Sequence, residues 1–138
     1  KSTRRFTDEL RDKLGFLQYA PVLNTSALTG QRVARVTDLV RYVAEQQAMR
    51  IKTSVLNELI RDAVSVNPPP MHRGRQLKIL FMTQTDICPP KFIIFVNDPE
   101  LMHFSYLRFL ENLLREQFCF EGPPLRLIVR ARKEEEDY

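Results

Sequence analysis

The chain has 138 residues, a formal net charge of +4 at pH 7, and a composition of 43% hydrophobic and 28% charged residues. These values are ordinary for a globular domain, so they exclude extensive disorder and a collagen-like fibre. The longest apolar run, residues 92–96, is far shorter than the roughly 20 residues that a membrane helix needs, and no membrane partner is expected.

The first fifty residues predict a helix, a short strand and a second helix. The first helix should begin at Thr7, where a capping hydroxyl precedes acidic residues, and should end at Gly15. A short apolar strand at residues 22–23 then leads into a turn that ends at Gly30. Over residues 31–49, apolar side chains recur at helical spacing, which predicts an amphipathic helix.

A second unit is predicted after a basic linker at residues 50–52. Thr53 can cap a helix in which apolar residues recur at i, i+3, i+4 and i+7. The recurring residues are Leu56, Leu59, Ile60 and Ala63. Three prolines, residues 68–70, predict an extended connector, and strands should follow over residues 77–85 and 92–96. The second strand is apolar throughout, so it should lie centrally and be covered, at least in part, on both faces.

The last part of the chain predicts a further helix and a third strand. The helix should begin at residues 97–99 and end at the Gly-Pro-Pro sequence of residues 122–124. Its buried stripe should consist of Leu107, Leu110, Leu114 and Phe118. Residues 125–131 alternate and predict a strand with one apolar and one arginine-rich face. The order α-β-β-α-β indicates an α+β fold, a three-stranded sheet covered by two helices on one face.

Motifs for catalysis or metal binding are missing from the sequence. It contains no GxGxxG, GxxxxGK[ST], HExxH or GxSxG motif. Cys88 and Cys119 have no CxxC spacing, and His72 and His103 are the only histidines, so no metal site is predicted. Two isolated thiols are typical of a protein in the reducing cytoplasm. We therefore predict no catalytic residue, no metal ligand and a cytoplasmic location.

One short motif points to nucleotide recognition. Ser26, Ala27 and Leu28 stand between the predicted short strand and the following helix. They resemble the last guanine-recognition motif of small GTP-binding proteins. In that interpretation the backbone N–H of Ala27 faces a purine oxygen, Ser26 holds the turn, and Leu28 lies beside the base. The alternative is an ordinary strand-to-helix turn without a ligand.

Longer segments resemble one bacterial GTPase family across essentially the whole chain. These segments are residues 56–58, 67–70, 74–79, 89–101, 103–108 and 120–126. They closely resemble the C-terminal domain of the Der family, also called EngA. The resemblance implies a protein with two consecutive GTP-binding domains and a KH-like domain, acting in assembly of the large (50S) ribosomal subunit. The full-length protein would bind GTP or GDP with Mg²⁺, whereas no cofactor is expected in this chain.

The same resemblance implies a division into three parts. Residues 1–50 would be the end of the second GTP-binding domain, an α-β-α remnant of a P-loop GTPase fold. Residues 51–133 would be the KH-like domain, and residues 134–138 an acidic tail. The phosphate loop, the switches and the Asn-Lys-x-Asp motif would precede Lys1, so this chain alone should not hydrolyse GTP. Because the first methionine is Met49, we expect the chain to be a piece of a longer protein.

The KH-like domain has two candidate partners, ribosomal RNA and the GTP-binding domains of the same protein. The chain has no GXXG loop, with which KH domains hold nucleic-acid backbone, so any RNA contact should be electrostatic. The candidate contacts to ribosomal RNA are Arg108, Arg115, Arg126, Arg130 and Arg132, each of which can instead be a solvated surface arginine. Alternatively, the domain docks on the GTP-binding domains of the same protein and does not contact RNA. We expect a monomer.

Overall fold

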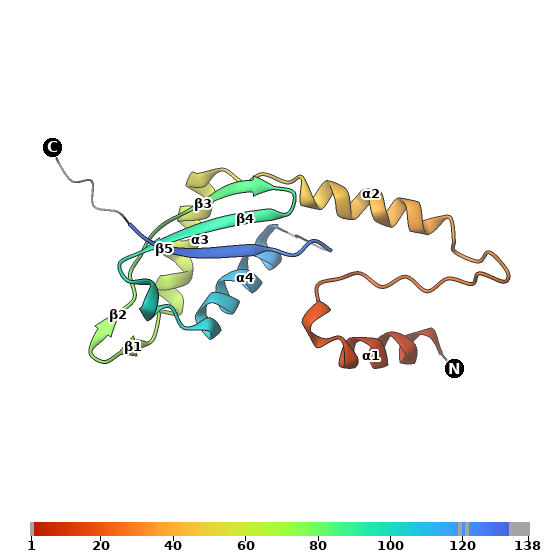
Figure 1. Ribbon diagram of the computed structural model, residues 1–138, viewed down its shortest axis with the longest axis horizontal. Coiled ribbons are helices and arrows are strands. Elements are labelled where there is room, and N and C mark those ends of the chain that lie inside the picture. The colour runs from red at the N-terminus through yellow and green to blue at the C-terminus, as the bar shows by residue number, and fades with distance from the viewer. Residues whose placement is uncertain (1, 119, 121, 133–138) are drawn as a thin grey trace.

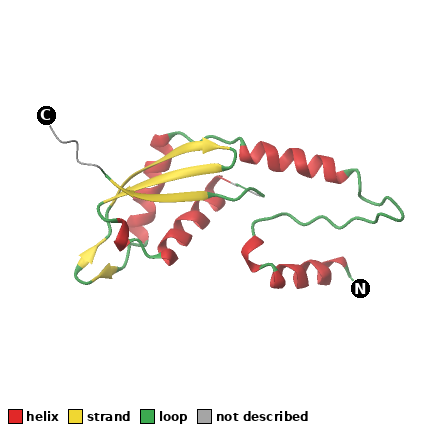
Figure 2. Cartoon of the chain, viewed as in Figure 1, coloured by secondary structure: helices red, strands yellow, loops and turns green. Residues whose placement is uncertain are grey.

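The computed structural model describes residues 2–118, 120 and 122–132 (Figure 1). The Cys119 thiol and the acidic tail at residues 134–138 lie outside the described residues. Helices and strands follow one another as shown in Figure 2: α1 (Thr3–Lys13), η1 (Gly15–Leu17), α2 (Arg35–Gln47), α3 (Thr53–Val66), β1 (Met71–His72), β2 (Arg75–Gln76), β3 (Ile79–Ile87), β4 (Pro90–Val96), η2 (Pro99–Leu101), α4 (Phe104–Phe118) and β5 (Arg126–Ala131). No helix in the described part of the chain is long and apolar enough to span a membrane.

The main sheet has three strands in the order β3-β4-β5. β3 and β4 are antiparallel, whereas β4 and β5 are parallel, as expected for a hairpin followed by a crossover helix. Helices α3 and α4 lie on one side of this sheet (Figure 1) and share its core. The fully buried side chains of this core include Leu56, Met82, Phe92, Ile94, Val96, Leu110 and Leu114. The predicted α+β order α-β-β-α-β of the two helices and the three-stranded sheet is thus confirmed.

A short hairpin that the sequence did not predict precedes the sheet. β1 pairs with β2 through Met71–Gln76 and His72–Arg75, and Arg73 and Gly74 form the turn. Both turn residues have positive φ, 49° and 75°, as two-residue hairpin turns require. An ion pair of 3.0 Å joins Arg75 to Asp98 and so holds the hairpin against the segment before η2. The predicted strand over residues 77–85 begins later, at Ile79, and continues to Ile87.

The predictions for the first fifty residues were wrong in three details. The residues at Val22 and Leu23 form no strand, because they have no neighbouring strand in the described chain with which to pair. α1 begins at Thr3 rather than Thr7, and the Thr7 hydroxyl donates to the Thr3 carbonyl within the helix. α2 begins only at Arg35, after a series of turns. Neither α1 nor α2 contains a buried residue.

The segment before α3 is more than a linker. Ile51 is a buried member of the main core, and its backbone N–H donates to Oε1 of Gln84 at 2.7 Å. Nε2 of Gln84 in turn donates to the carbonyl of Met49 at 2.8 Å. The predicted cap at Thr53 was also wrong, because Lys52 holds the N-cap position and no side chain caps the helix there. Because Met49 and Ile51 are hydrogen-bonded to Gln84 of β3, they already belong to the same folded unit as the sheet.

The α4 stripe was predicted almost correctly. Leu110 and Leu114 are fully buried, whereas Leu107 and Phe118 are only partly buried at the margin of the core. Tyr106 takes the buried position at the start of the helix, and its hydroxyl donates to the carbonyl of Asn67 at 2.9 Å. A hydrogen-bonded tyrosine can thus replace an aliphatic residue at the edge of the core.

Candidate functional site

Among the described residues, no helix covers the side of the sheet opposite α3 and α4 (Figure 1). Phe92, Ile94 and Val96 of β4 are fully buried beneath the helices, so the alternate residues of β4 point to the other side. The strand register places residues of β3 and β5 beside them. We call this surface the open sheet face, and the register assigns to it Phe81, Thr83, Asp86, Lys91, Ile93, Phe95, Arg126, Ile128 and Arg130.

An aromatic pair lies at one end of the open sheet face. The rings of Phe81 and Phe95 stack with their centroids 4.5 Å apart and an angle of 15° between their planes. Phe81 is 38% exposed, although large apolar side chains usually lie in the core. Ile93 and Ile128, a cross-strand pair, continue the apolar surface beside the two rings. The sequence predicts that β4 is covered, at least in part, on both faces. On the open sheet face, neighbouring side chains leave Ile93 only 9% exposed, but no helix of the described chain packs over it.

Basic residues lie on the same face as the aromatic pair, both beside it and at the other end of the strands. Arg130 is the cross-strand partner of Phe95, and Arg126 is the cross-strand partner of Lys91. Both arginines are exposed. Lys91 forms a 3.6 Å ion pair with Asp86, the acidic residue that faces it from β3. A cavity of about 350 Å³ lies at the end of the sheet where Lys91 and Arg126 are paired. These two residues line it together with residues 86–89, which form the end of β3 and the turn that follows.

The five predicted arginine contacts do not form one surface. Arg126 and Arg130 lie on the open sheet face, and exposed Arg132 follows directly after β5, with its N–H donating to the carbonyl of Val96. Arg108 and Arg115 lie on α4, which covers the opposite side of the sheet. Arg108 is exposed and sits above the Phe104 ring, 5.8 Å from its centroid.

Arg115 has structural partners within the protein. Its Nη1 donates to the carbonyls of Phe120 and Pro123, both at 2.9 Å. Its Nη2 approaches Oε1 of Glu111 at 3.4 Å, and its guanidinium lies over the Tyr19 ring. Only 14% of the side chain is exposed. Helical spacing alone placed Arg115 with Arg108, but the loop after α4 folds back and encloses it.

Ser26 forms two hydrogen bonds within the turn that the sequence predicts for guanine recognition. Its Oγ accepts a hydrogen bond from the N–H of Thr29 at 3.3 Å, and its carbonyl accepts one from Gly30 at 2.8 Å. Leu28 is 96% exposed, and Ala27 is also exposed. The turn therefore presents Ala27 and Leu28 outward, but it follows a loop instead of a strand. Contact of these residues with a purine stays a prediction.

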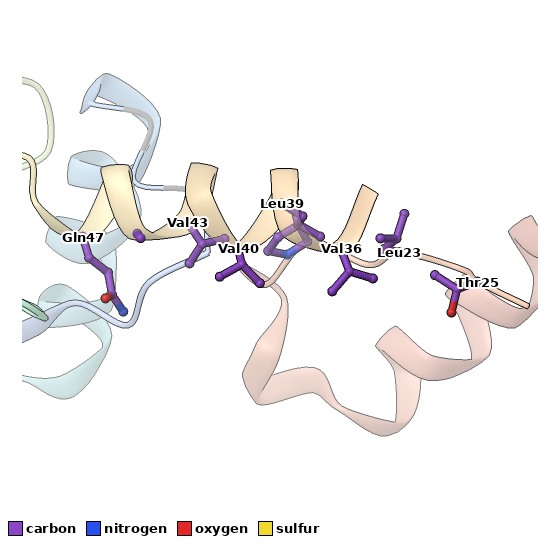
Figure 3. A pocket seen from close by; sticks show the side chains of 9 residues that line it. Leu23, Thr25, Val36, Leu39, Val40, Val43 and Gln47 are labelled. Carbon is purple, nitrogen blue, oxygen red and sulfur yellow. The ribbon is translucent and has the colours of Figure 1, made fainter. Parts of the chain in front are cut away.

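An apolar groove runs along α2 and was not predicted as a site. It has a volume of about 590 Å³ and lies between the helix and the loop that precedes the guanine turn. Figure 3 shows Val36, Val40 and Val43 along one side of α2, with Leu23 and Thr25 next to them. Val40 is 63% exposed. The apolar face that the sequence predicted for this helix is thus largely uncovered among the described residues.

Comparison with known proteins decides the family. The sequence profile described as "KH-domain-like of EngA bacterial GTPase enzymes, C-terminal" matches residues 50–130. The chain belongs to the EngA family. Similar proteins include GTPase Der of Desulfitobacterium hafniense (strain DSM 10664 / DCB-2), 55% identical over 99% of this chain and 31% of its own length. GTPase Der of Geobacillus sp. (strain WCH70) is also 55% identical, over 96% of this chain and 30% of its own length.

The EngA match confirms the resemblance found in the sequence and the KH-like fold. A third relative, GTPase Der of Heliobacterium modesticaldum (strain ATCC 51547 / Ice1), is 53% identical over 99% of this chain. This chain spans 31% of the first of these relatives, so it corresponds to a C-terminal portion of an EngA-family protein.

The residues that sequence reasoning missed are Phe81, Phe95 and Lys91. Phe95 stands in a continuous apolar run, which gives no sign of which alternate side chains face outward. Pairing the run with β5 would have given that sign, because Arg130 is the partner of Phe95. In this EngA-family domain, the alternating arginines of β5 therefore indicate which side chains of β4 face outward.

Proposed function

We propose that this chain is the C-terminal part of a GTP-binding protein that acts in assembly of the large ribosomal subunit, and that its KH-like domain contacts ribosomal RNA in the cytoplasm. The relatives named GTPase Der and the EngA-family match support the assignment to a GTP-binding protein. The role in ribosome assembly is what the sequence resemblance to this family implies. One observation carries the second part, the contact with ribosomal RNA. Arg126, Arg130 and Arg132 are exposed along and just beyond β5, on a face that no helix of the described chain covers. Such a row of cations suits a phosphate backbone.

We propose further that residues 1–50 are the end of a GTP-binding domain. The uncovered groove along α2 supports this assignment, because an amphipathic helix needs an apolar partner to bury its face. Ser26, Ala27 and Leu28 would contact the guanine base in the full-length protein. GTP, Mg²⁺ and GTP hydrolysis are assigned to the full-length protein, because this sequence contains no GxxxxGK[ST] phosphate loop.

A second candidate function is docking within the same protein. In that case the KH-like domain binds the GTP-binding domains and does not touch RNA. Arg115 favours it, since this arginine already joins α4 to Tyr19 in the first fifty residues. The two functions differ in their dependence on salt, because RNA binding releases counterions.

A salt titration of binding to large-subunit ribosomal RNA tests the proposal. The affinity of the chain should fall steeply with salt, and Arg126→Gln or Arg130→Gln should each reduce the salt slope by about one. Arg41→Gln, an exposed arginine of α2, is the charge-matched control and should leave the slope nearly unchanged. Absence of binding even at about 50 mM salt would contradict RNA contact and favour docking within the protein.

A further inference from the structure

We infer that the open sheet face is a binding surface for unpaired RNA, with bases stacking on the Phe81–Phe95 pair and phosphates held by the flanking cations. This inference rests on the proposed RNA function and specifies which form of RNA the domain takes. KH domains hold the backbone with a GXXG loop, which this chain lacks, so a different surface is needed.

The aromatic pair is already arranged for stacking. The two rings are nearly parallel, with 15° between their planes and 4.5 Å between their centroids. Phe81 is 38% exposed and is an edge-strand residue, since β3 is the outer strand of the sheet. A base that stacks on Phe81 would extend this pair, and base–aromatic stacking is a main contribution to single-strand binding.

The cations lie where phosphates of a bound strand would pass. The register places Arg130 next to Phe95, while Arg126 and Lys91 are paired at the other end of the face. Arg126 and Arg130 are four residues apart, or about 13 Å along the strand. The cavity beside Lys91 and Arg126 adds a recess at the far end of this path.

Charge favours a nucleic acid over a protein partner for this face. Lys91, Arg126 and Arg130 supply three positive charges, and the acidic residue paired with them is Asp86. A protein partner would need a matching acidic surface, whereas every RNA strand provides regularly spaced phosphates. Duplex RNA keeps its bases stacked inside, so only an unpaired segment can offer base faces to the phenylalanines.

The test compares one RNA in two forms. The probe is a labelled single-stranded oligoribonucleotide without self-pairing, and the comparison is the same strand annealed to its complement. Binding of the 138-residue chain is measured by fluorescence anisotropy over a range of salt concentrations. The single strand should bind at least several-fold more tightly than the duplex.

Variants separate stacking from charge. Phe81→Leu should weaken single-strand binding roughly ten-fold with little change in the salt slope, whereas Phe81→Tyr should retain binding because the ring is kept. Arg130→Gln should weaken binding and lower the slope by about one. Phe104→Leu is the matched control, since Phe104 is 67% exposed but lies on α4. Circular dichroism and the urea midpoint verify that each variant is folded.

The possible failures are distinguishable. Equal affinity for single strand and duplex, with Phe81→Leu behaving like Phe104→Leu, would overturn the stacking surface and leave the proposed RNA contact in place. No binding to either form would overturn both. If the Phe81 and Arg130 variants bind RNA normally but associate less with a polypeptide that supplies the preceding part of an EngA-family protein, the face is a protein interface and the inference is wrong.

Discussion

The guanidinium of Arg115 lies 4.2 Å from the centre of the Tyr19 ring. This contact joins α4 of the KH-like domain to the segment that follows η1. The loop after α4 adds a second link, because the N–H of Gly122 donates to the carbonyl of Tyr19 at 3.2 Å. Two parts of the chain that the sequence predicts as separate units therefore meet around one arginine.

Replacing Arg115 should reduce stability more than it reduces RNA affinity. Arg115→Met removes the donors to the carbonyls of Phe120 and Pro123 and the contact with the Tyr19 ring. Hydrogen bonds from charged groups contribute about 1.5–3 kcal/mol, so we expect a loss of about 2–3 kcal/mol in the free energy of unfolding, measured in urea. Arg108→Met, at an exposed site on the same helix, should change it by less than about 0.5 kcal/mol. Equal effects of the two substitutions would contradict the structural role.

Gly122 should tolerate no side chain. It has φ +100°, and a Cβ atom there would lie 2.6 Å from Cγ2 of Val43. Gly122→Ala therefore combines backbone strain with a clash and should cost about 2–4 kcal/mol of unfolding free energy. The double variant with Val43→Ala relieves the clash but not the strain, so it should be less destabilised than the sum of the two single changes. Simple additivity in denaturant unfolding would show that Val43 is not the obstacle.

Asn57 should be needed to finish the free edge of β3. Its Oδ1 accepts from the N–H of Met82 at 2.9 Å, and its Nδ2 donates to the carbonyl of Met82 at 3.3 Å. The side chain thus replaces a neighbouring strand. Asn57→Ala leaves both backbone groups without these partners and should cost about 2–3 kcal/mol. Asn57→Asp keeps only the acceptor, so its free energy of unfolding should lie between that of the wild type and that of Asn57→Ala.

Hydrogen exchange gives an independent check on Asn57. In Asn57→Ala the amide of Met82 should exchange much faster, because it loses its acceptor. Amides paired between β4 and β5 should keep their relative protection. Unchanged exchange at Met82 would mean that the edge of β3 is protected by something other than this side chain.

Stability should fall at high pH because of Tyr106. Burial raises the pKa of the Tyr106 phenol above its ordinary value of 10.0. The folded state therefore keeps this proton to higher pH than the unfolded chain does. The stabilisation is complete below pH 10 and is lost as the pH rises through the raised folded-state pKa.

The comparison with a phenylalanine variant isolates this effect. Tyr106→Phe should cost about 1 kcal/mol at neutral pH, since it removes the hydrogen bond to Asn67. This deficit should shrink as the pH rises above 10, because the wild type then has a buried phenol to ionise and the variant does not. Parallel curves for the wild type and Tyr106→Phe from neutral to high pH would contradict the prediction.

Local patterns in the sequence predicted the helices and strands of the KH-like domain. The spacing of Leu56 and Ile60 requires a helix with one buried face, and the apolar run of residues 92–96 requires a central strand. The alternation of Arg126 and Arg130 along the last strand predicted one basic face, since neighbouring strand residues point to opposite sides. These features depend only on the local repeat of a helix or a strand, so the sequence alone reveals them.

The tertiary structure determined which faces of these elements are buried and which residues their side chains contact. The register with β5 puts Phe95 beside Arg130 on the open sheet face, and the returning loop encloses Arg115. Val22 and Leu23 form no strand because no partner lies next to them. Length, composition and charge determined a folded, basic chain, but the contacts that decide each side chain's role join residues far apart in sequence. A local pattern determines which side chains share a face, whereas only long-range packing determines which residues they contact.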